Sequence, residues 1–216
     1  MSPKHHQQFP NVSAAIAAFQ AGRPVLLLDD DDREDEADIV AAAENLSLQT
    51  MAMMIRDCSG IVCLCLDEAT VDALQLAPMV QNNQARHGTG FTVTIEAAEG
   101  VSTGVSAQDR ITTIEAALRS TAEQRHIVSP GHVFPLRARE GGVLSRRGHT
   151  EGSVDLARLA GLRPAAVLCE LMNPDGSMAR GEQVAVYARQ YNLPVLTIAE
   201  LARCREAMEE QQAAFA

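Results

Sequence analysis

A dense run of acidic side chains lies between two apolar segments near the N-terminus. The stretch from Asp29 to Asp38 holds eight carboxylates and one arginine in ten residues, and Val25–Leu28 and Ile39–Ala43 flank it. Carboxylates held close together repel one another, and a hard divalent cation with oxygen ligands offsets that repulsion. A solvated charged turn is the alternative. Because both flanks are apolar enough to be buried, the loop is fixed at a sheet edge, which favours a cation site.

A second polar segment, Arg146 to Glu151, reads Arg-Arg-Gly-His-Thr-Glu just before a predicted helix. Arginines beside a helix N-terminus, where backbone N–H groups are free, favour an anion such as phosphate. Thr150 could instead serve only as an N-cap. His149 can bind a metal through neutral imidazole, or it can be a hydrogen-bonded structural residue.

Two more polar side chains are candidates because of their surroundings. His132 lies in Ser-Pro-Gly-His-Val-Phe-Pro, where proline and glycine restrict the backbone. Glu170 ends the apolar run Ala165–Cys169, at the carboxyl end of a predicted strand, a usual place for site residues in α/β proteins. A buried glutamate has a raised pKa when desolvation dominates, which suits proton transfer, and a structural ion pair is the alternative.

The elements that must position these residues alternate between helix and strand. Apolar periodicity predicts helices over 12–20, 150–160, 181–190 and 199–210, and strands over 25–28, 61–66, 91–95, 165–169 and 194–198. Two further helices are predicted from their caps: one that Ser47 caps, with Met51, Met54 and Ile55 at helical spacing, and one that Ser106 caps and that runs to Leu118. Residues 78–90 and 125–144 are turn-rich and are expected to be irregular. Strands interleaved with helices imply an α/β or α+β fold with a mixed sheet.

The composition limits the class of protein and its partners. With 216 residues, 46% of them hydrophobic, the chain can bury one core, and we expect one domain over 12–203 with tails over 1–11 and 204–216. A formal net charge of −10 argues against nucleic-acid and anionic-membrane partners. The chain has no apolar run of about 20 residues and no secretory signal, so it is expected to be cytoplasmic. Its five cysteines fit reduced core thiols better than disulfides.

Five motifs, in this order, resemble those of the 3,4-dihydroxy-2-butanone 4-phosphate synthase family. They are Arg-Glu-Asp-Glu-Ala-Asp at 33–38, Gly-Phe-Thr-Val-Thr-Ile-Glu-Ala at 90–97, Pro-Gly-His-Val-Phe-Pro-Leu at 130–136, Arg-Arg-Gly-His-Thr-Glu at 146–151 and Leu-Cys-Glu-Leu at 168–171. The resemblance covers about residues 12 to 201. It implies a single-domain mixed sheet flanked by helices, assembled as a homodimer with sites near the interface.

The resemblance also implies a reaction and the residues that perform it. Ribulose 5-phosphate would be converted into 3,4-dihydroxy-2-butanone 4-phosphate and formate for riboflavin synthesis, with Mg²⁺ or Mn²⁺ stabilising an enediol. Glu34 and His149 are implied as metal ligands, and His132 and Glu170 as catalytic residues whose order of proton transfer stays open. Substrate binding is implied for Arg33, Glu34, Asp38, Arg146, Arg147, Gly148, His149, Thr150 and Glu170.

Some positions depart from the family pattern, and two other classes of function stay open. Asp35 stands where the family usually has asparagine, Arg147 where a small residue is common, Ser129 where arginine is common and His87 where tyrosine is frequent. A sugar-phosphate isomerase or aldolase would also use an enediol, but it would release no formate. A non-enzymatic metal-binding protein would need the acidic run without the two catalytic candidates.

Overall fold

The computed structural model describes residues 8–30 and 33–214. Two acids of the acidic run, Asp31 and Asp32, lie outside the described residues, as do residues 1–7 of the expected N-terminal tail. Among the named elements, the first helix begins at Pro10 and the last helix ends at Ala214.

The described residues form a seven-stranded mixed sheet. Its order is β4-β5-β3-β6-β2-β1-β7. The strands are β1 (Val25–Leu28), β2 (Ala37–Ala42), β3 (Cys63–Leu66), β4 (Ile95–Ala97), β5 (Ile127–Arg137), β6 (Ala165–Glu170) and β7 (Val195–Thr197). Strand β6 is antiparallel to both of its neighbours, β2 and β3, whereas β3 pairs with β5 and β1 with β7 in parallel. The expected mixed sheet is confirmed.

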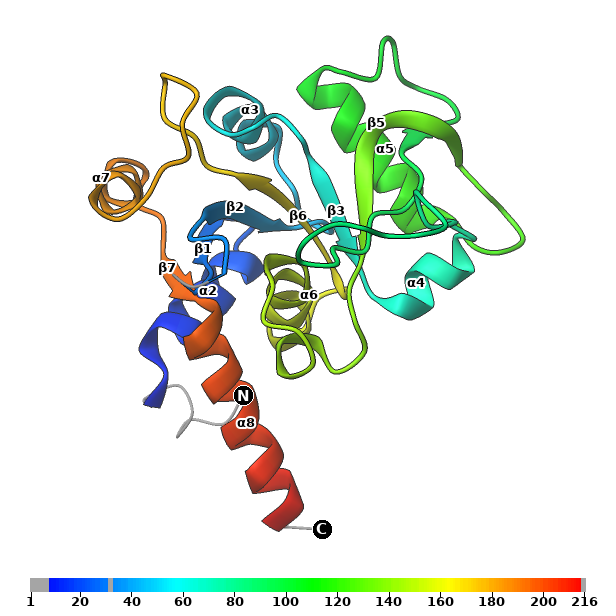
Figure 1. Ribbon diagram of the computed structural model, residues 1–216. Coiled ribbons are helices and arrows are strands. Elements are labelled where there is room, and N and C mark those ends of the chain that lie inside the picture. The colour runs from blue at the N-terminus through cyan, green and yellow to red at the C-terminus, as the bar shows by residue number, and fades with distance from the viewer. Residues whose placement is uncertain (1–7, 31–32, 215–216) are drawn as a thin grey trace.

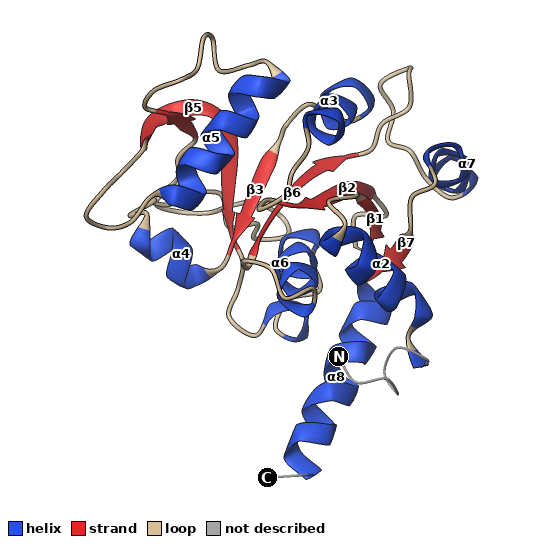
Figure 2. Cartoon of the chain, turned by 180° about the vertical axis from the view of Figure 1, so that it is seen from behind, coloured by secondary structure: helices blue, strands red, loops and turns tan. Residues whose placement is uncertain are grey.

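Helices cover both faces of this sheet (Figure 1). They are α2 (Pro10–Gln20), α3 (Leu48–Asp57), α4 (Glu68–Ala73), α5 (Ala107–Arg119), α6 (His149–Leu159), α7 (Glu182–Tyr191) and α8 (Ile198–Ala214), with the 3-10 turn η1 (Gly142–Leu144). Helices α3, α5 and α7 pack on one face, and α2, α6 and α8 on the other (Figure 2). Within the described residues, no helix combines the length and the apolar character that a membrane crossing requires.

Strand side chains alternate between the two cores, as the twofold period of a strand requires. In β3, Leu64 and Leu66 belong to the core under α3 and α5, whereas Cys63 and Cys65 belong to the core under α6. Cys63 and Cys65 therefore lie on the same face of the sheet. Because both faces are buried, these strands read as continuous apolar runs in the sequence.

Two expectations were wrong on the β4–β5 side of the sheet. Residues 125–144 were expected to be irregular, but 127–137 form β5, and the strand expected over 91–95 is instead β4 at 95–97. Strand β5 contains a bulge: Ile95 pairs with Val133 while Glu96 pairs with Val128. Gly131 lies in this bulge, where a Cβ atom would come within 2.0 Å of the Ile95 carbonyl oxygen. The proline and glycine that suggested a turn therefore belong to the bulge.

Candidate functional site

The candidate site lies beside the N-terminus of α6, where side chains from β2, β3, β5 and β6 meet. Antiparallel pairing places Asp38, near the start of β2, opposite Glu170, at the end of β6. A pocket of about 160 Å³ opens there. Seven of the residues predicted from the sequence line it: Arg33, Glu34, Asp38, Arg146, His149, Thr150 and Glu170.

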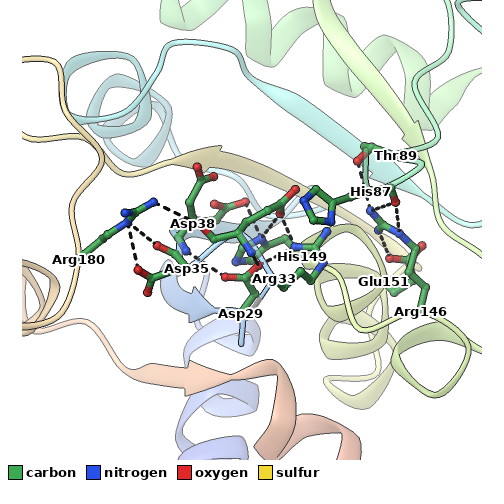
Figure 3. A network of polar contacts seen from close by, with 12 residues as sticks. Asp29, Arg33, Asp35, Asp38, His87, Thr89, Arg146, His149, Glu151 and Arg180 are labelled. Atoms are coloured by element: carbon green, nitrogen blue, oxygen red, sulfur yellow. Dashed lines mark hydrogen bonds and ion pairs between the residues drawn. The ribbon is translucent and has the colours of Figure 1, made fainter. Parts of the chain in front are cut away.

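The acidic loop is shaped around Asp29, the first residue after β1. Its buried carboxylate accepts hydrogen bonds from the backbone N–H groups of Glu34 (3.1 Å) and Glu36 (2.9 Å). The same carboxylate pairs with the Arg33 guanidinium at 2.6 Å (Figure 3), and that guanidinium also contacts the Glu34 carboxylate. Asp29 therefore fixes the loop backbone, and Arg33 offsets part of its negative charge.

His149 extends from the first turn of α6 into this group of carboxylates (Figure 3). Its Nδ1 atom lies 3.8 Å from Glu34 Oε2 and 3.7 Å from Asp38 Oδ2. Its other ring nitrogen, Nε2, is buried and has no hydrogen-bond partner among the described residues, and the same is true of Asp38 Oδ1. Buried polar atoms without partners are rare, and each needs an explanation.

The electrostatics of the pocket follow from burial and from these contacts. The neighbouring His149 lowers the pKa of Glu34 to about 2, with help from Arg33. Burial raises the pKa of Asp38 to about 7. Burial alone would lower the pKa of His149, but the carboxylates of Asp38, Glu34 and Asp29 raise it to about 9. The carboxylates around His149 therefore favour positive charge at this position.

The residues present fit a divalent cation. Ligand atoms of Asp29, Glu34 and His149 all lie within 4.8 Å of one another. Carboxylate oxygens suit hard cations such as Mg²⁺, and an imidazole nitrogen completes a donor set that Mn²⁺ also accepts. Asp29 already accepts three hydrogen bonds, so it has less ligand capacity left than Glu34, whose carboxylate accepts from Arg33 alone among the hydrogen bonds of the described residues. The unpartnered His149 Nε2 supports the same conclusion.

Arg146 forms the opposite wall of the pocket and is held rigidly. Its guanidinium pairs with the buried Glu151 carboxylate at 2.6 Å and donates to the His87 carbonyl oxygen and the Thr89 hydroxyl, both at 3.2 Å (Figure 3). Gly148 leaves room for it, since a Cβ atom there would lie 2.3 Å from Arg146 Nη1. A fixed guanidinium beside the N-terminus of α6 is suited to an anion.

Glu170 is fixed by a neighbouring hydroxyl. The Ser59 hydroxyl donates to Glu170 Oε2 at 2.5 Å, and it accepts a hydrogen bond from the Ile61 backbone N–H at 3.1 Å. The Ser59 N–H also donates to the Glu170 carbonyl oxygen at 2.9 Å. The Glu170 carboxylate therefore has a defined orientation at the edge of the pocket.

Three residues predicted for the site do not line this pocket. Gly148 lies behind Arg146 as the N-cap of α6. Arg147 is half exposed and points to Glu206 of α8, 3.5 Å away. His132 is also half exposed, and its Nδ1 lies 2.6 Å from Glu96 Oε2 on β4. The single chain therefore brings together the metal and phosphate candidates with Glu170, but not with His132.

Sequence reasoning missed the residues that organise the site. Asp29 and Glu36 were noticed only as part of the acidic run, Glu151 only as the last residue of the polar segment that begins at Arg146, and Ser59 not at all. The position of Asp29 directly after a buried strand was the available signal, because such a side chain can accept hydrogen bonds from the loop that follows. Ser59 offered no comparable signal.

These features define an α+β protein with a candidate divalent-metal site beside an anion-binding helix N-terminus. The family model described as 3,4-dihydroxy-2-butanone 4-phosphate synthase matches residues 13–204. A protein of that name from Pseudomonas putida is 91% identical over 213 residues, which cover 99% of each chain. One from Cupriavidus pinatubonensis is 64% identical over 195 residues, covering 90% of this chain and 87% of the relative.

Solved structures agree with the sequence comparisons. A crystal structure of a 3,4-dihydroxy-2-butanone 4-phosphate synthase in complex with two magnesium ions has a TM-score of 0.86 and 40% identity, and the match covers 92% of this chain and 97% of that one. A cation-free form has a TM-score of 0.83 and 39% identity, with 92% and 98% covered. This chain belongs to the 3,4-dihydroxy-2-butanone 4-phosphate synthase family, as its five motifs predicted.

Proposed function

We propose that this chain is a lyase that converts D-ribulose 5-phosphate into L-3,4-dihydroxy-2-butanone 4-phosphate and formate, a step of riboflavin biosynthesis. The observation that carries the proposal is the single pocket in which the Glu34–His149 cluster, Arg146 and Glu170 meet. The membership of this chain in the 3,4-dihydroxy-2-butanone 4-phosphate synthase family supports the same reaction. An isomerase or aldolase acting through an enediol is the alternative, and only the lyase releases formate.

Mg²⁺, or Mn²⁺ in its place, is the proposed cofactor, with Glu34 and His149 as its protein ligands. The magnesium complex of a relative supports this choice. When bound, the ion supplies a Lewis acid that stabilises negative charge developing on the ketone and hydroxyl oxygens of the substrate. Two protein ligands leave positions on an octahedral ion for water and for those oxygens. Arg33 and Asp29 hold the loop that presents Glu34.

The phosphate end of the substrate is proposed to bind at the N-terminus of α6. The positively charged Arg146 lines the pocket there, and Thr150 lies in the first helical turn, where backbone N–H groups are free. Gly148 keeps the approach open because it has no side chain. Asp38 and Arg33 lie on the opposite wall of the pocket, where they can contact the sugar hydroxyls. Arg147, which points to α8, is proposed to contribute charge rather than a contact.

Glu170 and His132 are proposed to exchange protons with the reacting carbons. The reaction requires removal of a proton from the carbon beside the ketone and later proton return, so it needs an acid and a base. Ser59 occupies Oε2 of Glu170, which leaves Oε1 for proton transfer. The contact with Glu96 fixes the tautomer of His132 by engaging Nδ1, which leaves Nε2 for the substrate.

A homodimer would bring His132 to a pocket. The face around His132 carries the exposed apolar side chains Ile61, Val105 and Val128. Buried Arg110 ties this face together, since it donates to the carbonyl oxygens of Val105, Gly60 and His132. Exposed apolar groups gathered around a catalytic candidate are typical of an interaction surface. We therefore infer that a second copy of the chain covers this face and that each pocket uses the His132 of its partner.

Mixing two inactive variants tests the shared site. His132→Asn and Glu170→Gln homodimers should each be nearly inactive, but after subunit exchange a hybrid contains one pocket with both wild-type groups. Formate release should return toward a quarter of the wild-type rate. If light scattering shows an active monomer, or if the mixture stays inactive after proven exchange, the shared site is wrong.

We place the enzyme in the cytoplasm. All five cysteines are buried and none of them forms a disulfide, which fits a reducing compartment. The substrate, a sugar phosphate, is a cytoplasmic metabolite class. Fractionation of cells that express the chain with a compartment marker would test this placement.

Incubation with ribulose 5-phosphate is the experiment that tests the activity. Formate should appear with Mg²⁺ present, disappear with excess chelator and return when Mg²⁺ is restored. Turnover of ribulose 5-phosphate without formate would favour the isomerase or aldolase instead.

A further inference from the structure

The acidic loop is held from outside the pocket by a residue with no assigned role, Arg180. Its Nε donates to the Asp35 carbonyl oxygen at 2.9 Å, and its Nη2 lies 3.4 Å from the Glu34 carbonyl oxygen. Its guanidinium also lies 3.3 Å from the Asp35 carboxylate (Figure 3). One planar guanidinium thus contacts two successive peptide groups and one side chain of the segment that carries Glu34.

Asp35 gives the loop a conformation that needs such support. Its φ of 53° is in the left-handed region, which residues other than glycine adopt at a cost, although aspartate and asparagine tolerate it better than most. This turn directs the Glu34 and Asp35 carbonyl groups toward Arg180, while Asp29 binds the N–H groups of Glu34 and Glu36. Both sides of the backbone around Glu34 are therefore held by side chains from outside the loop tip.

Arg180 is itself anchored by the connection between β6 and α7. Its backbone N–H donates to Gln183 Oε1 at 3.0 Å, and the Asn173 amide donates to the same oxygen at 3.1 Å. Met172 and Met178 pair across this connection in an isolated β-bridge. The segment that follows Glu170 is therefore a folded arm, and Arg180 at its end has a defined position.

We propose that Arg180 is a positioning residue for the metal site. It holds the Glu34–Asp35 backbone so that the Glu34 carboxylate stays beside His149, and it offsets the extra negative charge of Asp35. This inference rests on the proposed function, in which Glu34 binds the divalent ion. The connection between β6 and α7 thus follows Glu170, which lines the pocket, and carries Arg180, which contacts the acidic loop, near its other end.

The charge of Arg180 and the planar geometry of its guanidinium group contribute differently to the position of the acidic loop. The ion pair with Asp35 is half exposed on both sides, and pairs of that kind contribute little. The two carbonyl contacts need the planar fork of a guanidinium, which a lysine ammonium does not reproduce. The proposal therefore assigns most of the effect to the carbonyl contacts.

Direct Mn²⁺ binding to the substrate-free protein, followed by electron paramagnetic resonance, tests the proposal. Arg180→Ala should bind Mn²⁺ roughly 10–20-fold more weakly than wild type, at the low end of the range for groups that orient a metal ligand. Arg180→Lys should resemble Arg180→Ala, and Asp35→Asn should stay within about twofold of wild type because the carbonyl contacts remain. At saturating Mg²⁺, Arg180→Ala should regain a wild-type kcat, since the ligands themselves are intact.

Arg189→Ala is the matched control. Arg189 is an exposed arginine on α7 that pairs with Glu182 at 2.6 Å. Its loss should leave Mn²⁺ affinity unchanged. Equal affinities of Arg180→Ala and Arg189→Ala, or full recovery in Arg180→Lys, would overturn the positioning role. Formate release by the wild-type chain judges the proposed function separately, so the two can fail independently.

Discussion

His149 and His132 are both candidates for chemistry, and their surroundings differ in almost every respect. His149 is buried at the start of α6, faces the carboxylates of Glu34 and Asp38, and keeps Nε2 without a partner in the described part of the chain. His132 is half exposed in the bulge of β5 and contacts one carboxylate, that of Glu96.

The difference shows how one residue type serves two purposes. The buried His149 imidazole faces carboxylates of its own chain. All the residues proposed to bind the cation therefore belong to one chain. The half-exposed His132 imidazole contacts Glu96 but does not line the pocket, which is why we propose that a second copy of the chain completes its site. The comparison predicts that changes around His149 alter metal binding, whereas changes around His132 alter the chemical step alone.

The largest effect is expected from the metal cluster. Glu34→Gln and His149→Asn each remove a proposed ligand, so both should weaken Mg²⁺ binding by at least about 100-fold and abolish turnover at ordinary Mg²⁺ concentrations. Calorimetric titration with Mg²⁺, beside formate release, measures both effects. Glu44→Gln, at an acid outside the pocket, is the control. Wild-type Mg²⁺ affinity in either ligand variant would contradict the assignment.

The catalytic pair should show the opposite pattern. His132→Asn and Glu170→Gln should lower kcat by roughly 10²–10⁴-fold, the usual contribution of a general acid or base, while Mg²⁺ and ribulose 5-phosphate still bind. Calorimetry and formate release on the same preparations separate the two quantities. If His132→Asn lost metal binding to the same extent as His149→Asn, the proposed division of roles between the two histidines would be wrong.

Arg146 should affect substrate affinity more than turnover. Removing a charge-assisted contact that is made equally in the ground and transition states raises KM by roughly 10–100-fold with little change in kcat. Arg146→Ala also leaves the buried Glu151 carboxylate without its partner, so Arg146→Ala combined with Glu151→Gln is the better variant. An unchanged KM in that double variant would remove Arg146 from the phosphate site.

A smaller effect concerns the stability of the metal-free protein. The pKa of His149 is raised from 6.5 to about 9 in the folded chain, so its contribution is fully present below pH 6.5 and is lost as pH rises through 9. The contribution is roughly 3 kcal/mol at most. Urea unfolding in chelator at pH 6, 7.5 and 9 should show this loss, and His149→Asn should flatten it. A wild-type profile as flat as that of His149→Asn would show that the imidazole is not charged in the fold.

The sequence predicted the elements whose signals are local. Val25–Leu28 and the run 165–169 read as buried strands because both of their faces are covered, and Ser47 and Ser106 cap their helices as expected. Strand β5 was missed because Pro130 and Gly131 are turn residues in isolation, whereas pairing with β4 accommodates them in a bulge.

The candidate site was predicted through its motifs, and its supporting contacts were not. Ser59 orients Glu170 from 111 positions away, and Arg180 reaches the acidic loop across 145. Nothing in the local sequence of either residue indicates its partner, because β6 must first pair with β3 to place Glu170 beside Ser59 and with β2 to place the acidic loop beside Arg180. Long-range hydrogen bonds of this kind appear only once the fold brings distant segments together.

The proposed reaction converts ribulose 5-phosphate into a four-carbon product and formate, and resemblance to the family implies that C4 is the carbon released. Nuclear magnetic resonance with substrate labelled with ¹³C at C4, or separately at C1, tests it most directly. With Mg²⁺ present, the label from C4 should appear in formate, and the label from C1 should stay in the four-carbon product. Excess chelator should stop both changes. Formate labelled from C1, or turnover of the sugar without any formate, would contradict the account.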